Sequence, residues 1–268
     1  MISCFRNYIF DKNITMEVLS LYIYPIKSLP AIKINHSVVD KDVLQFDIIF
    51  ALYDAQGIMQ TRRICKGLAD YLLELKGNTL MIYSKVLEKS INIKCYGEGH
   101  ESIPLNVWDR VEEGFADKES INQFFSDHHG KKLHLYLIKK SFSGFSSFHD
   151  DSPILICNET SIAYLESKTD VKIDIMRFRP NIVVSSKNPF DEGIWKRLRI
   201  NGCEYNSVKL CSRCIVVNQE PSTSRADLNV LQLMEPYTKS SFKIKFGLYL
   251  NPLSESIVRL FDKIDVVE

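Results

Sequence analysis

Two cysteines, Cys211 and Cys214, stand three positions apart in the stretch LCSRCIVV, residues 210–217. A pair at this spacing could supply half of a zinc site, form a redox couple, offer a thiolate to another metal, or pack as two small apolar side chains. A structural zinc site needs four Cys or His ligands, but the chain has no second CxxC motif and no HxxxH pair downstream. A thioredoxin-like couple needs a helix N-terminus, whereas CIVVNQEP continues as a strand and then turns. Taken alone, the pair favours packing.

The elements that position these cysteines are expected to be short strands. Helical periodicity is confined to three stretches, 116–129, 158–168 and 225–236, the last ending before Pro236. Strands this short and numerous are typical of barrels and sandwiches, so we expect a mainly β fold with minor helices (α+β). The alternating or β-rich runs include EVLSLYIY (17–24), TLMIYS (79–84), KLHLYLIK (132–139) and KIKFGLYL (243–250).

The chain is long enough for two ordinary domains, with 268 residues of which 45% are hydrophobic. The polar segment KKSFSGFSSFHDDSP (139–153) separates two β-rich halves. We therefore expect an N-terminal extension over 1–15, a first domain over 16–138 and a second over 139–268. Within the separating segment, FHDD (148–151) could line a substrate entrance or form a solvated loop.

Charge and cysteine usage restrict the class of protein. A formal net charge of +1 argues against coating nucleic acid or an anionic membrane, so an anionic ligand needs a local cationic pocket. The N-terminal stretch lacks the apolar run of a secretory signal, and no window reaches membrane-spanning length. Seven scattered cysteines, an odd number, indicate reduced thiols. We expect a cytoplasmic protein without a membrane span or a nucleic-acid partner.

Four motifs occur in order along the chain: YPIKSLP (24–30), MRFRPNIVVS (176–185), IWKRLRING (194–202) and CSRC (211–214). In this combination the sequence resembles the MOSC superfamily, in which an N-terminal MOSC-type β-barrel domain precedes a MOSC domain, as in the mitochondrial amidoxime-reducing component and its bacterial relatives. The resemblance extends from about Met16 to the end of the chain. It implies a β-barrel MOSC domain packed with a β-rich N-terminal domain, and a bound molybdenum cofactor.

The resemblance assigns the metal ligand, and the catalytic role, to Cys214, the second cysteine of the CxRC-like motif. A soft thiolate suits a metal already held by the dithiolene sulfurs of a pterin, and a metal-bound thiol is deprotonated. Arg213 either lowers the pKa of that thiol or is solvated on the opposite face of the strand. In a regular strand Cys211 also faces away, which favours packing, and Ser212 is a further donor by position.

A cationic contact is predicted in the turn after the first strand. Pro25 ends the ladder of that strand, so the next residues can present Lys27 and Ser28 to an anion. By resemblance both bind the phosphate side of the pterin, whereas outside the family match Lys27 would be an exposed loop lysine. Arg179 and Asn181 of FRPN are cofactor contacts by the same correspondence, because a guanidinium can grip a phosphate or a pterin carbonyl through two N–H groups.

The sequence departs from the family pattern at three places, one of which is the turn NQEPSTS (218–224), where relatives more usually have Asp-Pro-x-Thr-Gly. Relatives commonly carry an Asp-Arg pair where this chain has Asp47 followed by Ile48, so one expected contact is missing. Arg62 or Arg63, on the strand after the next tight turn, could replace it, and we select Arg62. Where well-known relatives place a serine, this chain has Asn158, which can bind the cofactor or cap its own helix.

Molybdenum at such a site implies oxygen-atom transfer, because the family's reduced metal removes oxygen from N-hydroxylated compounds such as amidoximes and needs two electrons per turnover. The sequence shows neither plant-type iron–sulfur spacing nor GxGxxG after a strand, so a separate flavin, heme or iron–sulfur donor protein is expected. Two alternatives stay open. The chain could handle sulfur, since MOSC domains also end molybdenum cofactor sulfurases and are described as binding pyridoxal phosphate. It could also be a non-catalytic cofactor carrier.

Overall fold

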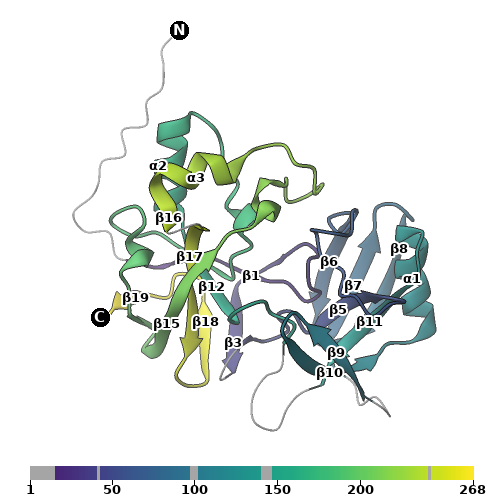
Figure 1. The fold of residues 1–268 in the computed structure, drawn as a ribbon. Helices are drawn as coiled ribbons and strands as arrows, with labels where there is room; N and C mark the ends of the chain where they lie inside the picture. Colours follow the sequence, from purple (N-terminus) through teal and green to yellow (C-terminus); the bar gives the residue numbers. More distant parts are fainter. Residues whose placement is uncertain (1–15, 41–42, 97–101, 140–146, 241–242) are drawn as a thin grey trace.

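The structure, a computed structural model, describes residues 16–40, 43–96, 102–139, 147–240 and 243–268. Strands dominate and helices are few, which confirms the mainly β fold class. The strands form where apolar residues alternate: in β7 (Thr79–Ser84) every second side chain is buried. Figure 1 shows β5 to β11 and α1 gathered on one side of the molecule, and the large sheet with α2 and α3 on the other.

The large sheet joins strands from both ends of the chain. Its order is β19-β14-β15-β17-β12-β13-β1-β2, with β16 paired to β17. β12 and β13 are parallel and the other pairs are antiparallel. The bounds are β1 (Val18–Ile23), β2 (Ile32–Ile34), β12 (Ile154–Asn158), β13 (Ile182–Val184), β14 (Arg197–Ile200), β15 (Cys203–Ser212), β16 (Lys239–Ser240), β17 (Lys243–Pro252) and β19 (Ile264–Val266).

Three smaller sheets have the orders β5-β11-β10-β9, β18-β3-β4 and β6-β7-β8. No closed barrel is assigned among the described residues. The two arms of the large sheet nevertheless meet, because Glu17 and Lys263, beside β1 and β19, form an antiparallel bridge, and the backbone N–H of Val18 donates to the carbonyl of Asp262 at 3.0 Å. The bounds are β3 (His36–Asp40), β4 (Val43–Leu44), β5 (Phe50–Asp54), β6 (Tyr71–Lys76), β8 (Lys89–Lys94), β9 (Ser102–Val107), β10 (Arg110–Ala116), β11 (Leu133–Ile138) and β18 (Ser256–Arg259).

The three predicted helical stretches form helices α1 (Glu119–His129), α2 (Glu159–Thr169) and α3 (Val230–Thr238). The expected stop before Pro236 is wrong, because α3 continues through that residue into a final turn. No helix in the described part of the chain has the length and apolar character needed to cross a bilayer. Short 3₁₀ turns are η1 (Ile175–Phe178), η2 (Asp191–Gly193) and η3 (Ile215–Asn218).

The buried apolar residues form three clusters. One lies among β5 to β11 and α1, around Phe50 and Phe125. The second contains residues of the large sheet, such as Val18 of β1, together with Val39 of β3. The third packs α2, α3 and η3 on the large sheet. The division predicted between residues 138 and 139 therefore does not coincide with a division between sheets. As a domain boundary it stays a prediction.

Candidate functional site

A cavity of about 440 Å³ lies where the two sides of the molecule meet, lined by residues 24–109 from the N-terminal part and 149–249 from the C-terminal part. Cofactor sites commonly have volumes of about 300–1,000 Å³. Seven of the eight predicted site residues line this cavity: Lys27, Ser28, Arg62, Arg179, Asn181, Ser212 and Cys214. They are separated by up to 187 positions in the sequence, so the fold alone brings them together.

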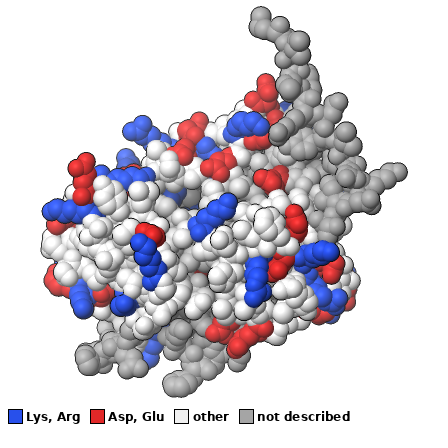
Figure 2. Space-filling model, turned by 180° about the vertical axis from the view of Figure 1, so that it is seen from behind, with Lys and Arg blue, Asp and Glu red and all other residues white. Residues whose placement is uncertain are grey.

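The wall of the cavity is cationic although the chain is nearly neutral. Lys and Arg side chains outnumber Asp side chains in the lining by six to three. On the face of the molecule seen from behind, Lys and Arg are instead interspersed with Asp and Glu (Figure 2). Positive charge is therefore concentrated locally, as an anionic ligand requires. The cations are Lys27, Arg62, Arg63, Arg177, Arg179 and Arg213, and the acids are Asp109, Asp150 and Asp151.

Both cysteines of CSRC line the cavity, because the strand that carries them is irregular. The register of β15 against β17 shifts between Leu210 and Ser212, the strand ends at Ser212, and Cys214 then precedes η3. Strict alternation between two faces is lost at such shifts, so Cys211 reaches the cavity wall while it also packs in the third apolar cluster, as the packing alternative predicts. The half-buried Cys214 thiol has no hydrogen-bond partner among the described residues.

Arg213 binds Cys211 rather than Cys214. Its Nη1 donates to the Sγ of Cys211 at 2.7 Å, and its Nη2 donates to the carbonyl of Phe178 at 2.6 Å. The Sγ of Cys211, a residue 4% exposed, also donates to the hydroxyl of Tyr249 at 3.1 Å. Burial by itself lowers the pKa of Arg213, but the thiols of Cys211 and Cys157 and the Tyr249 hydroxyl outweigh it and the pKa is raised. The Arg213 guanidinium is thus fixed in the cavity wall by hydrogen bonds and is not a solvated group.

Lys27 and Ser28 lie in the turn that the sequence predicts after β1, and Ser28 has a positive φ of 70°. Lys27 is buried, contrary to an exposed loop lysine. Its Nζ donates to the carbonyl of Phe148 at 2.6 Å and to Oδ1 of Asp150 at 2.5 Å. Burial lowers the pKa of Lys27, and the neighbouring Asp150 carboxylate offsets only part of that effect.

Arg62 is a buried cation whose hydrogen bonds go to carbonyl groups. Its Nε donates to the carbonyl of Ser28 at 2.8 Å and its Nη1 to that of Pro221 at 3.1 Å. Among the described residues it makes no ion pair. Burial, followed by repulsion from Arg179, lowers the pKa of Arg62 to about 9. The site therefore holds a guanidinium that an anion would stabilise.

Arg179 is a second cation of this kind. Its backbone is left-handed, with φ 53°, which directs Nη1 to the carbonyl of Leu29 at 2.8 Å and places the guanidinium 4.1 Å from the ring centre of Tyr24. Burial lowers its pKa. Arg177, two residues earlier, also lines the cavity, but both of its terminal nitrogens are occupied by Asp227, at 2.8 and 2.7 Å. Arg179 is the better available donor of the two.

Asn181 lines the cavity, but its side-chain amide links two strands. Its Oδ1 accepts from the backbone N–H of Leu155 at 3.0 Å, and its Nδ2 donates to the carbonyl of Tyr22 at 3.3 Å. Asp47 accepts from the backbone N–H of Tyr24 at 2.7 Å beneath this region. Burial raises the pKa of Asp47 to about 7. Ser212 is an exposed residue that also lines the cavity.

Asn158 is the one predicted site residue outside the cavity lining. Its Oδ1 accepts from the backbone N–H of Thr160 at 3.0 Å and so caps α2. Its Nδ2 donates to Ser186 at 2.7 Å and to Glu192 at 3.0 Å. The side chain is fully buried and occupied by these bonds, so the structure favours the capping alternative over a ligand contact.

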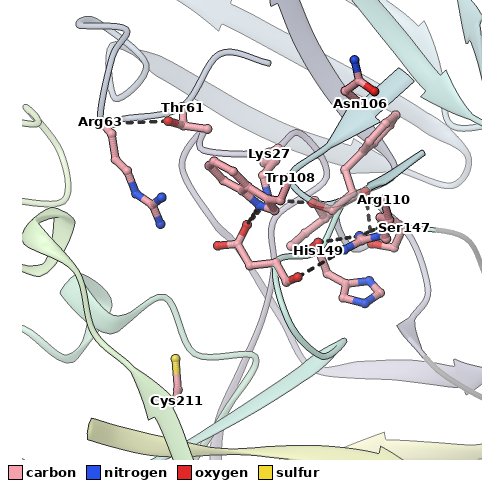
Figure 3. Close-up of polar contacts among 12 residues, drawn as sticks. Lys27, Thr61, Arg63, Asn106, Trp108, Arg110, Ser147, His149 and Cys211 are labelled. Carbon is pink, nitrogen blue, oxygen red and sulfur yellow. Dashed lines mark hydrogen bonds and ion pairs between the residues drawn. The ribbon is translucent and has the colours of Figure 1, made fainter. Parts of the chain in front are cut away.

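Sequence reasoning missed Trp108 and Asp150 as members of this site. Trp108 is 46% exposed, and its Nε1 donates to Oδ1 of Asp150 at 2.8 Å. The guanidinium of Arg63 lies 4.9 Å from the ring centre of Trp108. Figure 3 shows Arg63 and Trp108 on one side of this region and Cys211 on a separate strand. The sequence signal for Asp150 was the motif FHDD. Its last three residues line the cavity, which agrees with the first alternative, a cavity-lining segment, rather than with a solvated loop.

Comparison with known families accounts for this arrangement. The family model described as the MOSC N-terminal beta barrel domain matches residues 15–132, and that of the MOSC domain matches residues 143–265. The chain is a MOSC-domain protein. The resemblance based on four motifs is thereby confirmed. Neither description includes pyridoxal phosphate, and the expectation of that cofactor has no support.

The MOSC chain is similar to two kinds of curated protein. It is 25% identical to the molybdenum cofactor sulfurase of Oryza sativa subsp. japonica, over 88% of the chain and 32% of that protein. It is 35% identical to mitochondrial amidoxime reducing component 2 of Bos taurus, over 38% of the chain and 33% of that protein. These matches span about a third of each relative. Among solved structures, the YUAD protein from Bacillus subtilis gives a TM-score of 0.42 at 12% identity, over 94% of each chain.

Proposed function

We propose that this MOSC protein binds the molybdenum cofactor in the cavity, with Cys214 as the metal ligand, and reduces N-hydroxylated small molecules. The observation that carries the proposal is the meeting of an unbonded thiol and several buried cations on the wall of one cavity. The cofactor has the complementary chemistry, because its metal takes soft sulfur ligands and its pterin ends in a phosphate. The similarity to molybdenum-related proteins supports the same assignment.

The residues present fit that group. Arg62 bonds only carbonyls and Arg179 donates to a carbonyl, so N–H groups of both remain for an anion, and their mutual repulsion falls when one binds. Lys27 is the third cation, and Ser28 and Ser212 are hydroxyl donors on the same wall. Cys214 offers the thiolate. We leave Asn158 out of the contact set because it lies outside the lining.

When bound, the cofactor supplies two-electron oxygen-atom transfer, which converts R–NHOH, two electrons and two protons into R–NH₂ and water. The role of the chain's own residues is to hold and orient the cofactor. Lys27, Arg62 and Arg179 would hold the negatively charged end, and Cys214 would fix the other end within the same cavity. Trp108 and Arg63 border the remaining space, where a small substrate would lie. We assign the electrons to a separate donor protein. A cytoplasmic location stays a prediction.

The proposal is tested by measuring molybdenum and pterin per mole of chain after expression in a molybdenum-sufficient host, together with reduction of benzamidoxime by an artificial electron donor. Cys214→Ala should abolish molybdenum retention and turnover, and the cofactor-free variant should unfold at the same temperature as the cofactor-free wild type. Cys203→Ala is the matched control, because that half-buried thiol lies outside the cavity lining. Wild-type chain without molybdenum, or full molybdenum content in Cys214→Ala, would refute the assignment.

A sulfur-carrying protein is a second candidate, favoured by the presence of Cys211 and Cys214 on the same cavity wall. In that case the Cys214 thiolate would attack the outer sulfur of a persulfide on a donor protein, which forms the Cys214 persulfide and releases the donor's cysteine thiolate. The mass of the intact chain separates the two candidates. A mass increase of one sulfur atom on Cys214, without benzamidoxime reduction, favours the carrier. A non-catalytic cofactor carrier would show molybdenum without either signal.

A further inference from the structure

The lysine that the family resemblance assigns to a phosphate already holds an internal anion. The Nζ of Lys27 lies 2.5 Å from Oδ1 of Asp150, and the Nε1 of Trp108 donates to the same oxygen at 2.8 Å. Lys27 lies 5.9 Å from the ring centre of Trp108, so the three groups form one cluster at the cavity wall. Figure 3 shows Lys27 and Trp108 side by side in this cluster.

The segment that carries Asp150 is itself anchored. Arg110 donates to the backbone carbonyls of Ser147 at 3.1 Å, His149 at 2.6 Å and Asp150 at 3.2 Å. Figure 3 shows the Arg110 side chain directed at this segment. Arg110 fixes the backbone of this loop at three carbonyls. The position of the Asp150 carboxylate next to Lys27 is therefore set by the loop.

Breaking the ion pair costs Lys27 more free energy than it costs Asp150, because the two side chains differ in exposure. The Lys27 side chain is 7% exposed and that of Asp150 is 48% exposed. Asp150 can turn outward to water, whereas Lys27 without a partner would be an unpaired buried charge, which is costly. Burial by itself raises the pKa of Asp150, but Lys27, Trp108 and Arg63 outweigh it and hold the pKa below its usual range, so the carboxylate stays charged at neutral pH.

We propose that Asp150 is the specificity-determining residue of the anion site: it acts as an internal competitor that occupies Lys27 until a more highly charged anion displaces it. A monoanion such as a carboxylate offers Lys27 nothing that Asp150 does not already supply. A phosphate ester carries a charge of about −1.5 to −2 and three acceptor oxygens, so it gains more from Lys27, Arg62 and Arg179 together than the single Asp150 carboxylate does.

Asp150 therefore determines how much negative charge a ligand must carry to displace it from Lys27 and bind in the cavity. The inference rests on the proposed function only in taking a phosphate ester as the ligand class. It concerns the protein without its cofactor and can be measured there.

The test uses the full chain from a host unable to make the molybdenum cofactor, with inorganic phosphate and acetate as probes in calorimetric titrations at fixed ionic strength. Asp150→Asn keeps an acceptor oxygen for Lys27 and Trp108 but removes the charge. Asp151→Asn is the matched control: the neighbouring residue also lines the cavity, and its carboxylate pairs with Lys209 at 2.9 Å instead. Both variants change the net charge equally.

Asp150→Asn should tighten phosphate binding by about tenfold and make acetate binding measurable, since a charge-assisted competitor is removed. Asp151→Asn should stay within about threefold of wild type. In a Lys27→Met background, Asp150→Asn should have no further effect. Trp108→Phe, which removes one donor from Asp150, should tighten phosphate binding by a smaller factor.

Equal tightening in Asp150→Asn and Asp151→Asn would overturn the proposal, because the effect would then be bulk charge. Unchanged or weaker phosphate binding in both Asp150→Asn and Trp108→Phe would overturn it as well, as would an effect of Asp150→Asn that survives Lys27→Met. None of these readouts depends on molybdenum or on benzamidoxime reduction. Failure of the proposed function therefore gives a different pattern from failure of this inference.

Discussion

Replacing Arg62 by methionine should separate ligand binding from protein stability. Methionine keeps the length of the side chain but removes a buried cation that has no acidic partner among the described residues. If the role of Arg62 is to bind an anion, the buried and unpaired guanidinium destabilises the unliganded protein. The variant should then retain less cofactor and be no less stable than wild type.

The magnitude follows from the electrostatics of the site. The difference between a pKa of about 9 for Arg62 and the ordinary arginine value of about 12.5 corresponds to about 5 kcal/mol against the charged form. Releasing the carbonyls of Ser28 and Pro221 costs about 1–3 kcal/mol in total where water can reach them. The net gain for Arg62→Met in the unliganded chain is therefore about 2–4 kcal/mol, or about 4–16 °C in unfolding temperature for a chain of this size.

The assay pairs thermal unfolding of the unliganded chain with phosphate titration. Loss of a charge-assisted contact should weaken phosphate binding by about tenfold or more. Arg63→Met is the matched control, because it removes the same charge from an exposed neighbour. An Arg62→Met variant that unfolds several degrees below wild type and binds phosphate normally would refute the reasoning, and Arg62 would instead be a structural clamp for two carbonyls.

The remaining predictions concern other parts of the chain. Cys211→Ala should lower the free energy of unfolding by about 1–3 kcal/mol, because Arg213 loses a buried acceptor, and should retain molybdenum, unlike Cys214→Ala. Asn158→Ala should cost about 1 kcal/mol for the lost cap of α2 and about 1–3 kcal/mol more for the donor that buried Glu192 loses, measured by chemical denaturation, without changing molybdenum content. Burial, and then His128, lower the pKa of His129 to about 4, below the value of about 6.5 in the unfolded chain. His129 should therefore contribute a loss of stability as the pH falls from about 6.5 toward 4, because the unfolded state binds the additional proton, whereas Asp47, whose pKa is raised to about 7, contributes in the opposite direction over this range.

Each of these outcomes has its own check. His129→Gln should flatten the fall in stability between pH 7 and pH 5, whereas His134→Gln, at a half-buried site, should not; equal slopes would contradict the assignment. Molybdenum loss in Asn158→Ala would return that residue to the cofactor site. Loss of molybdenum in Cys211→Ala equal to that in Cys214→Ala would indicate a paired role for the two thiols.

The mainly β character was predictable because it depends on local periodicity. Alternation in stretches such as 79–84 needs no knowledge of the partner strand, and the three helical stretches carry their own apolar spacing. Strand order was not predictable, because β1 pairs with β13, about 160 positions away. The end of α3 was missed because proline usually marks a helix end, whereas here Pro236 lies inside the helix, which continues to Thr238.

For the site, the sequence by itself determined the chemical types: a thiol at Cys214 and cationic side chains at Lys27, Arg62 and Arg179. Only the tertiary structure decided which of them face one cavity and what each already binds. Asp150 reaches Lys27 across 123 positions, and a register shift in β15 turns Cys211 to the cavity. The physical reason is that a side chain's type is local, whereas its burial, partner and charge environment arise from contacts between segments distant in the chain.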